Sequence, residues 1–224
     1  MTTAAEFDFQ AVFLLLKARF GPRQWWPAET PFEVVVGAIL TQNTAWSNVE
    51  RAIASLKAAG ALAPAAIGHL AIDELEQLIR PTGFFRQKAV RLQHLAAILV
   101  DRYGGDVAQL CAGPLDQARG RLLALPGIGP ETADSILLYA AQRPSFVVDA
   151  YTRRIFTRLG LLTGKEGYEV IRARFLDALP HEYPLFNEYH ALIVTLAKGH
   201  CRKQQPKCPT CPLQQICRFA LPNR

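Results

Sequence analysis

The chain has 224 residues, half of them hydrophobic, and 25 Lys and Arg against 19 Asp and Glu give it a net charge of +6. This length allows one large domain or two modest ones, and the basic balance favours a polyanionic partner, although it also suits an ordinary soluble protein. No apolar run approaches the ~18–20 residues of a membrane span, and no basic segment precedes the first apolar one as it does in a secretory signal. We therefore expect a cytoplasmic protein with no membrane partner.

The first hundred residues read as helices separated by turns. The segments with a helical spacing of apolar residues are 5–20, 31–40, 46–60, 64–69, 73–79 and 85–103. The second of these is apolar nearly all round and is therefore predicted to be buried. A loop containing Trp25, Trp26 and Pro27 precedes it, and the uncharged polar run 41–44 follows it.

A tight turn with two glycines, PGIGP at residues 126–130, lies between two helical patterns in the middle of the chain. Pro130 suits the first position of the second helix, and Glu131 falls in its first turn. Backbone N–H groups at such a helix entry form an anion site. In a basic chain the expected anion is a DNA phosphate, so Gly127 and Gly129 are candidate phosphate-binding residues.

The rest of the chain adds helices over about 149–160, 166–178 and 185–199, and its one β-like run, PSFVVDA, is too short to pair alone. We therefore predict an all-α fold, a stack of short helices in two lobes.

A lone carboxylate, Asp149, follows the second hairpin helix by some ten residues, behind an apolar run. A helix–glycine hairpin–helix followed by such an aspartate resembles the helix-hairpin-helix DNA glycosylase superfamily. The resemblance to its endonuclease III family covers essentially the whole chain, from the helix near residue 31 through Cys217. It implies a six-helix barrel lobe over 28–143, with the hairpin at about 118–141, and a cluster lobe formed by 1–27 and 144–224.

Four cysteines near the end of the chain have the spacing C-x6-C-x2-C-x5-C, namely Cys201, Cys208, Cys211 and Cys217. Thiolates prefer zinc or iron–sulfur clusters, and the spacing alone leaves a tetrathiolate zinc site as a serious alternative. Placed after the hairpin and the aspartate, however, this spacing matches the [4Fe-4S] loop of the endonuclease III family, over residues 201–217. The fifth cysteine, Cys111, is expected to be a packing residue.

Basic side chains lie between the first two cluster cysteines. Arg202, Lys203 and Lys207 are candidates for contacts with DNA phosphates, and simple solvated charge is the alternative. Such contacts release counterions, so DNA binding should weaken with salt.

The resemblance assigns Asp149 the task of orienting a water or stabilising the oxocarbenium-like sugar as the base departs. A helix N-cap is the structural alternative for this residue, and both roles are compatible. Bifunctional members of the family carry a lysine nucleophile two residues after the second hairpin glycine, where this chain has Glu131. Because a carboxylate cannot form a Schiff base, AP-lyase activity should be weak or absent.

The family fills the gap left by a flipped base with side chains from two loops, which correspond here to Gln42 and Phe84. A loop residue at a helix end and a core-packing residue are the respective alternatives.

Three stretches, Trp-Trp-Pro, Thr-Gln-Asn-Thr-Ala-Trp and Pro-Thr-Gly-Phe-Phe-Arg-Gln-Lys-Ala, look like the 3-methyladenine DNA glycosylase III branch. In that branch two aromatics sandwich the flipped base, which implies a base pocket of Trp25, Trp26, Pro27 and Trp46. A cationic alkylated purine would gain a cation–π contribution there. Tryptophans that only seal a core are the alternative, and members of that branch need not carry the cluster.

We therefore expect a monomeric base-excision DNA glycosylase acting on alkylated purines in double-stranded DNA. It would hold a [4Fe-4S] cluster, bind a monovalent cation at the hairpin when DNA is bound, and be associated with the nucleoid. The alternatives are an oxidised-pyrimidine or mismatch glycosylase, a DNA-binding repair protein with little turnover, and, more remotely, a helix-hairpin-helix scaffold.

Overall fold

The computed structural model describes residues 8–23 and 26–221, and every regular element within these ranges is helical. The predicted all-α class is confirmed. The chain divides into two compact units, Met1–Trp25 with Pro144–Arg224 and Trp26–Arg143, which we call the cysteine unit and the hairpin unit. None of the helices in the described ranges is long and apolar enough to cross a membrane.

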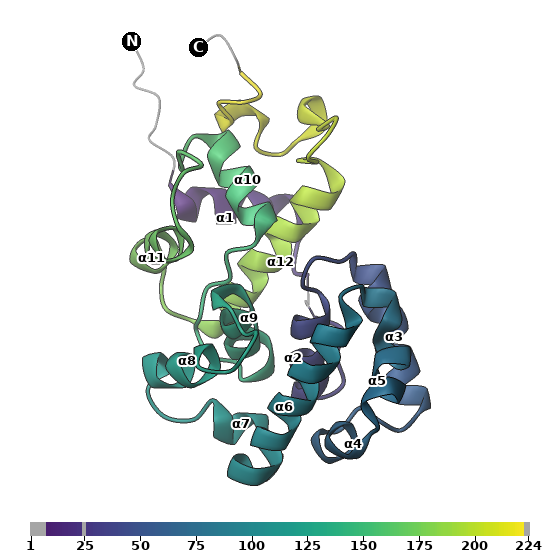
Figure 1. The fold of residues 1–224 in the computed structure, drawn as a ribbon. Helices are drawn as coiled ribbons and strands as arrows, with labels where there is room; N and C mark the ends of the chain where they lie inside the picture. Colours follow the sequence, from purple (N-terminus) through teal and green to yellow (C-terminus); the bar gives the residue numbers. More distant parts are fainter. Residues whose placement is uncertain (1–7, 24–25, 222–224) are drawn as a thin grey trace, which may run out of the picture. The chain divides into compact units, whose positions relative to one another are not determined.

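The hairpin unit is a bundle of short helices around one core (Figure 1). Its elements are α2 Pro31–Leu40, α3 Trp46–Ala58, α4 Pro64–His69, α5 Ile72–Ile79, η1 Arg80–Thr82, α6 Phe85–Tyr103, α7 Val107–Leu110, α8 Leu115–Leu123, α9 Pro130–Ser135 and η2 Ile136–Ala140. Residues 32–40 of α2 are all buried, as its apolar composition predicts. Thr30 caps this helix, because its hydroxyl accepts a hydrogen bond from the Glu33 N–H at 3.1 Å.

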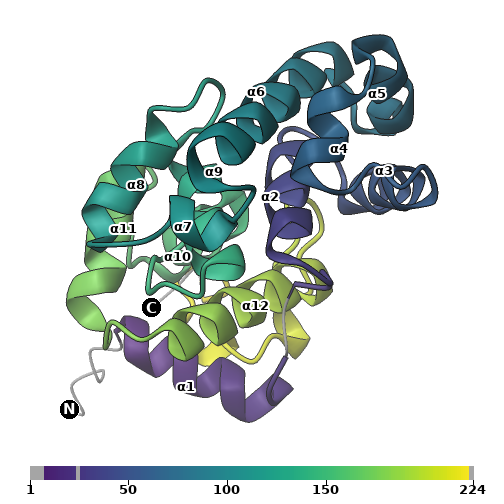
Figure 2. The ribbon, with the colours of Figure 1, turned by 90° about the horizontal axis from the view of Figure 1, so that it is seen from below.

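The longest helix of this unit, α6, runs beside α4 and α5 (Figure 2). Its buried face carries Ala89, Leu92, Leu95, Ala96 and Leu99, the spacing from which the helix was predicted. One charged residue, Lys88, lies on the same buried face.

The cysteine unit consists of α1 Phe9–Phe20, α10 Ala150–Leu159, α11 Tyr168–Ala178, α12 Tyr183–Gly199, η3 Cys208–Thr210 and η4 Gln214–Ile216. Figure 2 shows α1 alongside α12, and Figure 1 shows the C-terminal segment, in yellow, at the ends of α10 and α12. Stacked aromatic rings form the core of the unit: the Phe146 and Phe175 centroids are 3.9 Å apart. The Tyr189 hydroxyl donates to the Phe9 carbonyl at 2.6 Å, which attaches α1 to α12.

Candidate active site and cysteine cluster

Two helices of the hairpin unit, α8 and α9, form the predicted helix-hairpin-helix. Pro130 is the first residue of α9 and Glu131 is exposed in its first turn, as expected. Arg119 on α8 clamps the two helices through a bidentate ion pair with Asp134 on α9, at 2.9 and 3.0 Å. Asp134 is 0% exposed, so the pair is buried and depends on both partners.

The two hairpin glycines have different surroundings. A β-carbon on Gly129 would meet nothing within 4 Å, so the backbone at the start of α9 is open to an incoming group. Gly127 has a φ of +80°, and a β-carbon there would collide with the Arg91 guanidinium. Glycine is needed at Gly127 both for this conformation and for the approach of Arg91.

Gln42, a predicted wedge residue, makes two hydrogen bonds to the hairpin and one to Arg91 on α6. Its amide nitrogen donates to the Gly127 carbonyl at 3.1 Å and to the Thr132 hydroxyl at 3.0 Å. Its amide oxygen accepts from Arg91 at 2.8 Å. Both ends of the side chain are therefore engaged in this conformation.

Phe84, the second predicted wedge residue, is 67% exposed, so it is not a core-packing residue. It occupies the N-cap of α6 with a left-handed backbone, φ +47°. A non-glycine residue in this region costs roughly 1–2 kcal/mol. An exposed aromatic in a strained backbone is a feature of functional loops.

Lys88 lies one turn into α6 and is 1% exposed. Its ammonium donates to the Leu40 carbonyl at 2.8 Å and to the Thr82 carbonyl at 2.9 Å. Burial, together with the charge of Arg91, lowers the pKa of Lys88 to about 8. Lys88 therefore joins the end of α2 to the loop that carries Phe84.

Trp26 and Trp46 line one cavity of about 260 Å³ in the hairpin unit, together with Pro27, Gly37, Glu33, Glu50 and Lys57. The Trp26 backbone has a φ of +79°. Its ring packs on Tyr139, with centroids 4.7 Å apart. Gly37 leaves room for this ring, because a β-carbon there would lie 3.3 Å from it. Trp25 lies outside the described residues.

The two indoles meet edge to face, with centroids 5.3 Å apart and planes at 79°. A base held between two parallel rings needs about 7 Å between them, so this arrangement differs from the expected sandwich. The Trp46 ring is fixed by a 3.0 Å hydrogen bond from its Nε1 to Glu50. The buried Glu33 carboxylate forms an ion pair with Lys57, with 3.0 Å between Lys57 Nζ and Glu33 Oε1.

Asp149, in the cysteine unit, caps α10. Its Oδ1 accepts hydrogen bonds from the Thr152 N–H at 2.7 Å and from the Thr152 hydroxyl at 2.9 Å, so the N-cap interpretation is correct for this oxygen. Its Oδ2 lies 3.5 Å from His190 Nε2. Burial by itself raises the pKa of the Asp149 carboxyl. His190 and the two Thr152 donors lower this pKa by more than burial raises it, so the net pKa lies below its usual value. With a side chain 15% exposed, Asp149 is an ionised carboxylate with one oxygen outside the cap.

The sequence patterns did not point to His190, Arg119, Lys88 or Arg91. No local motif identifies His190, which reaches Asp149 from α12, or Arg119, which pairs across the hairpin. Lys88 could have been recognised from the sequence, because a lysine four residues before Leu92 falls on the apolar face of the predicted helix.

The four cluster cysteines, Cys201, Cys208, Cys211 and Cys217, line a second, small cavity. Burial, and the other sulfurs nearby, raise the pKa of Cys211 and Cys217, so these thiols need a bound cation to stay deprotonated. In the part of the chain that the structure describes, no three Cys, His, Asp or Glu side chains converge on a point where one metal ion could be held.

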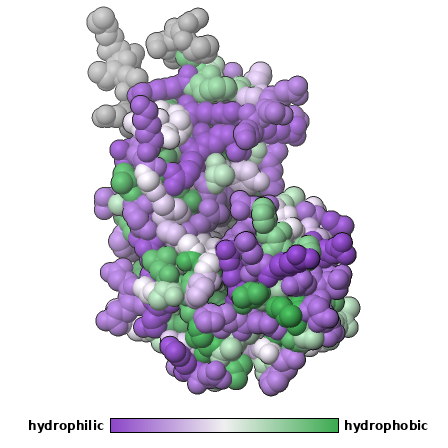
Figure 3. Space-filling model, viewed as in Figure 1, coloured by the Kyte–Doolittle hydropathy of each residue, from purple (hydrophilic) through white to green (hydrophobic). Residues whose placement is uncertain are grey.

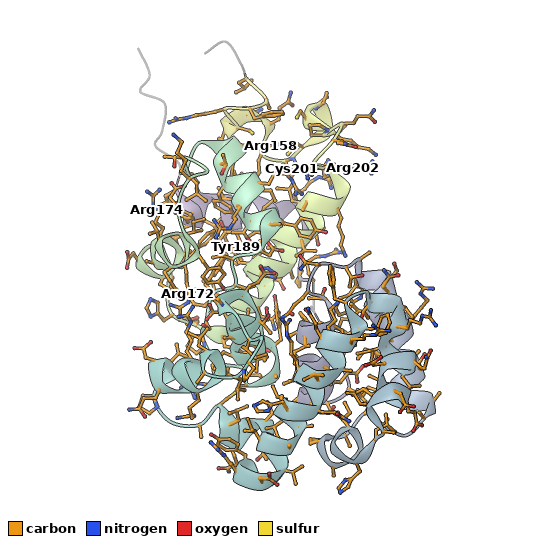
Figure 4. All side chains as sticks on the ribbon, viewed as in Figure 1. Arg158, Arg172, Arg174, Tyr189, Cys201 and Arg202 are labelled. Carbon is orange, nitrogen blue, oxygen red and sulfur yellow. The ribbon has the colours of Figure 1, made fainter. Side chains whose placement is uncertain are left out.

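Arg158 is the charged residue that lines this cavity, and Figure 4 shows it beside Cys201. Its guanidinium donates to the Cys201 sulfur at 3.3 Å and to the Arg202 carbonyl at 2.7 Å. Cys111, by contrast, is buried in the core of the hairpin unit, which confirms its packing role.

The candidate phosphate-binding side chains Arg202, Lys203 and Lys207 are all exposed. Arg202 also donates from Nε to the Lys198 carbonyl at 3.3 Å. On the face drawn in Figure 3 the surface is mostly hydrophilic, with small hydrophobic patches.

Residues 36–181 match the family described as HhH-GPD superfamily base excision DNA repair protein. A provisionally named DNA repair glycosylase of Methanocaldococcus jannaschii is 47% identical over 208 residues, covering 92% of this chain and 94% of that protein. Endonuclease III of Thermotoga maritima is 31% identical over 189 residues, covering 84% of this chain and 83% of that enzyme.

Solved structures share the fold at moderate identity. A complex of endonuclease III with DNA matches with a TM-score of 0.81 at 26% identity, covering 95% of this chain and 96% of that one. The Helicobacter pylori 3-methyladenine DNA glycosylase bound to 1,N6-ethenoadenine matches with a TM-score of 0.74 at 28% identity, covering 86% of this chain and 98% of that one.

An all-helical fold with a helix-hairpin-helix and a following half-buried aspartate, together with these relatives, defines a base-excision DNA glycosylase. The chain belongs to the HhH-GPD superfamily, and its type is that of endonuclease III. The resemblance inferred from the sequence is confirmed.

Proposed function

We propose that this glycosylase binds damaged double-stranded DNA, flips an alkylated purine out of the helix and hydrolyses its N-glycosidic bond, leaving an intact abasic site. The proposed choice of base rests on the indole-lined cavity, because two carboxylates, Glu33 and Glu50, also line it. Lys57 pairs with Glu33 and with the adjacent Glu29, so the acidic side chains outnumber the basic one. Such a lining favours a positively charged base over a neutral one.

An alkylated purine with a quaternised ring nitrogen carries that positive charge. Each indole face adds a cation–π attraction of about 0.5–2 kcal/mol. The volume of about 260 Å³ is near the lower end of small-molecule pockets, ~300–1,000 Å³, which suits a single base. Because the two indoles meet edge to face with centroids 5.3 Å apart, we infer that one of them turns when a base enters. A related enzyme, the Helicobacter pylori glycosylase, is bound to an alkylated purine base, 1,N6-ethenoadenine.

Asp149 supplies the chemical step of the proposal. One carboxylate oxygen is committed to the cap of α10, so the other, Oδ2, would orient a water or stabilise the positive charge that develops on the sugar. A cationic purine is already a good leaving group, which reduces the need for a strong general acid. His190, beside Oδ2, would hold this oxygen in place.

The absence of a lyase step is a separate part of the proposal. Glu131 is exposed at the hairpin position where bifunctional relatives carry the amine nucleophile. A carboxylate there cannot form a covalent imine with the sugar. Borohydride treatment should therefore trap no protein–DNA adduct.

We propose that the four cysteines hold a [4Fe-4S] cluster. When bound, such a cluster supplies structural cross-linking and one-electron redox chemistry. The four cysteines that line the small cavity supply a donor set that fits it, and their spacing matches the cluster loop of the endonuclease III family. The exposed basic residues of the same loop and the backbone N–H group of Gly129 would then contact DNA phosphates.

The test is base release from methylated DNA, with Glu50→Gln as the discriminating variant. Glutamine keeps an acceptor for Trp46 Nε1 but removes the charge. We expect the wild type to release 3-methyladenine or 7-methylguanine without strand cleavage, and the variant to lose tenfold or more on these cations while keeping its rate on neutral 1,N6-ethenoadenine. Release of pyrimidines alone would refute the base assignment, and tight lesion binding without any release would refute the enzymatic one.

A further inference from the structure

Three loops of the hairpin unit meet on one helix, α6. They are the run after α2 that holds Gln42, the loop after η1 that holds Phe84, and the hairpin turn with Gly127. The Gln42 and Phe84 loops are hydrogen-bonded to Arg91 and to Lys88, respectively, and the hairpin turn is covered by Arg91. Arg91 is three residues beyond Lys88 on α6, so the two cations lie on the same face of the helix.

Lys88 holds the Phe84 loop on both sides of the strained residue. Its backbone N–H donates to the Phe84 carbonyl at 3.1 Å, and its ammonium donates to the Thr82 carbonyl at 2.9 Å. The same ammonium bonds the last residue of α2, Leu40, directly before the loop of Gln42. A buried ammonium with two carbonyl partners fixes two segments far apart in the sequence.

Arg91 performs the corresponding task for Gln42 and the hairpin. Its guanidinium donates to the Gln42 amide oxygen at 2.8 Å and covers Gly127, where no side chain fits. Gln42 in turn donates to the Gly127 carbonyl. The position of Gln42 is therefore set by the same helix that sets the position of Phe84.

We propose that Lys88 and Arg91 form a two-cation brace on α6 that positions Gln42 and Phe84 as one unit, so that both enter the DNA duplex together when a base is flipped. This inference rests on the proposed wedge role of the two residues and on no particular lesion. It assigns both cations a positioning role, since neither needs to touch the reacting atoms.

The brace can be tested without any glycosidic chemistry. The probe is a duplex with a tetrahydrofuran abasic-site analogue opposite 2-aminopurine, whose fluorescence reports insertion into the gap. For Lys88→Met and for Arg91→Met we expect a loss of tenfold or more in the preference for this duplex over an undamaged one. Binding to undamaged duplex at low salt should stay within twofold, because both variants keep the proposed phosphate-binding residues Gly129, Arg202, Lys203 and Lys207. Arg91 is partly exposed, so that variant tests the brace even if Lys88→Met folds poorly.

The matched control is Leu99→Ala, which removes a buried side chain from the same helix about three turns beyond Lys88. It should lower the thermal midpoint yet keep the preference and the fluorescence change. Adding Gln42→Ala to Lys88→Met should cost little more than either change alone, because the two act through one arrangement. The proposal is overturned if the brace variants keep the preference within twofold, if Leu99→Ala loses as much, or if the double variant is additive. Failure of the wild type itself to prefer the abasic duplex would instead count against the proposed function.

Discussion

Asp149 caps α10 through Oδ1, and the proposed chemistry uses Oδ2, so two substitutions should separate the two roles. Asp149→Asn keeps an oxygen that can accept from Thr152, so the cap of α10 survives while the charge is lost. Asp149→Ala removes the acceptor for both Thr152 donors, which lie 2.7 and 2.9 Å from Oδ1. Loss of an N-cap acceptor costs about 1 kcal/mol, with a range of roughly 0.5–2. Base release should fall by about 10²–10⁴-fold in both variants, because both lose the charged Oδ2.

The two quantities are measured by urea unfolding at pH 7 and by single-turnover base release from methylated DNA. The alanine variant should be less stable than the asparagine variant by about the value of the cap. The pKa of Asp149 is lowered in the folded protein, so its charge contributes stability above its unfolded pKa of 3.8. That contribution disappears as the pH falls through the folded value, so wild type and Asp149→Asn should converge in stability in acid. If Asp149→Asn retains base release within tenfold of the wild type, the carboxylate is a cap only and the mechanism is wrong.

Three further predictions concern the charged side chains Arg119, Lys88 and Arg158. Arg119→Met should destabilise the hairpin unit by about 3–5 kcal/mol in urea unfolding, because it removes both Arg119 hydrogen bonds from the buried Asp134 carboxylate. Adding Asp134→Asn should recover part of this loss, and a double variant as unstable as the single one would contradict the prediction. The pKa of Lys88 is about 8 in the folded protein against an ordinary value of 10.5, so the charged form of Lys88 opposes folding below pH 8. The free energy of unfolding should therefore rise by up to about 3 kcal/mol as the pH increases from 8 to 10.5. Comparison of the wild type with Lys88→Met across this pH window isolates that rise, and equal slopes would show that Lys88 does not titrate there. If the proposed [4Fe-4S] cluster is bound, Arg158→Gln should make its reduction potential more negative in protein-film voltammetry, because the variant loses the N–H bond from Arg158 to the Cys201 sulfur. Arg202→Gln should leave the potential unchanged, because the Arg202 side chain bonds the Lys198 carbonyl instead.

Most of the helices could be predicted from local patterns in the sequence. The helix over 85–103 follows from its periodicity and the buried helix at 31–40 from its apolar composition. Pro130 marks the start of α9 because proline suits that position. The division of roles between the two oxygens of Asp149 did not follow, since it depends on His190, which is 41 positions away in the sequence and reaches it only after folding. The indole arrangement also depends on tertiary packing, because Tyr139 and Glu50 fix the two rings in orientations that no motif encodes.

The cysteine unit is built from two separate stretches of chain, and this affects the order in which the protein can form. During synthesis α1 leaves the ribosome first, but its partners α12 and the Phe146–Phe175 stack come after the whole hairpin unit. Domains fold largely as they leave the ribosome, and apolar segments that stay exposed during this time are prone to misassembly. The buried side chains of α1, including Phe9, Val12 and Leu16, must therefore stay uncovered until α12 arrives. A nascent chain halted soon after residue 143 should contain a folded hairpin unit and a protease-sensitive α1.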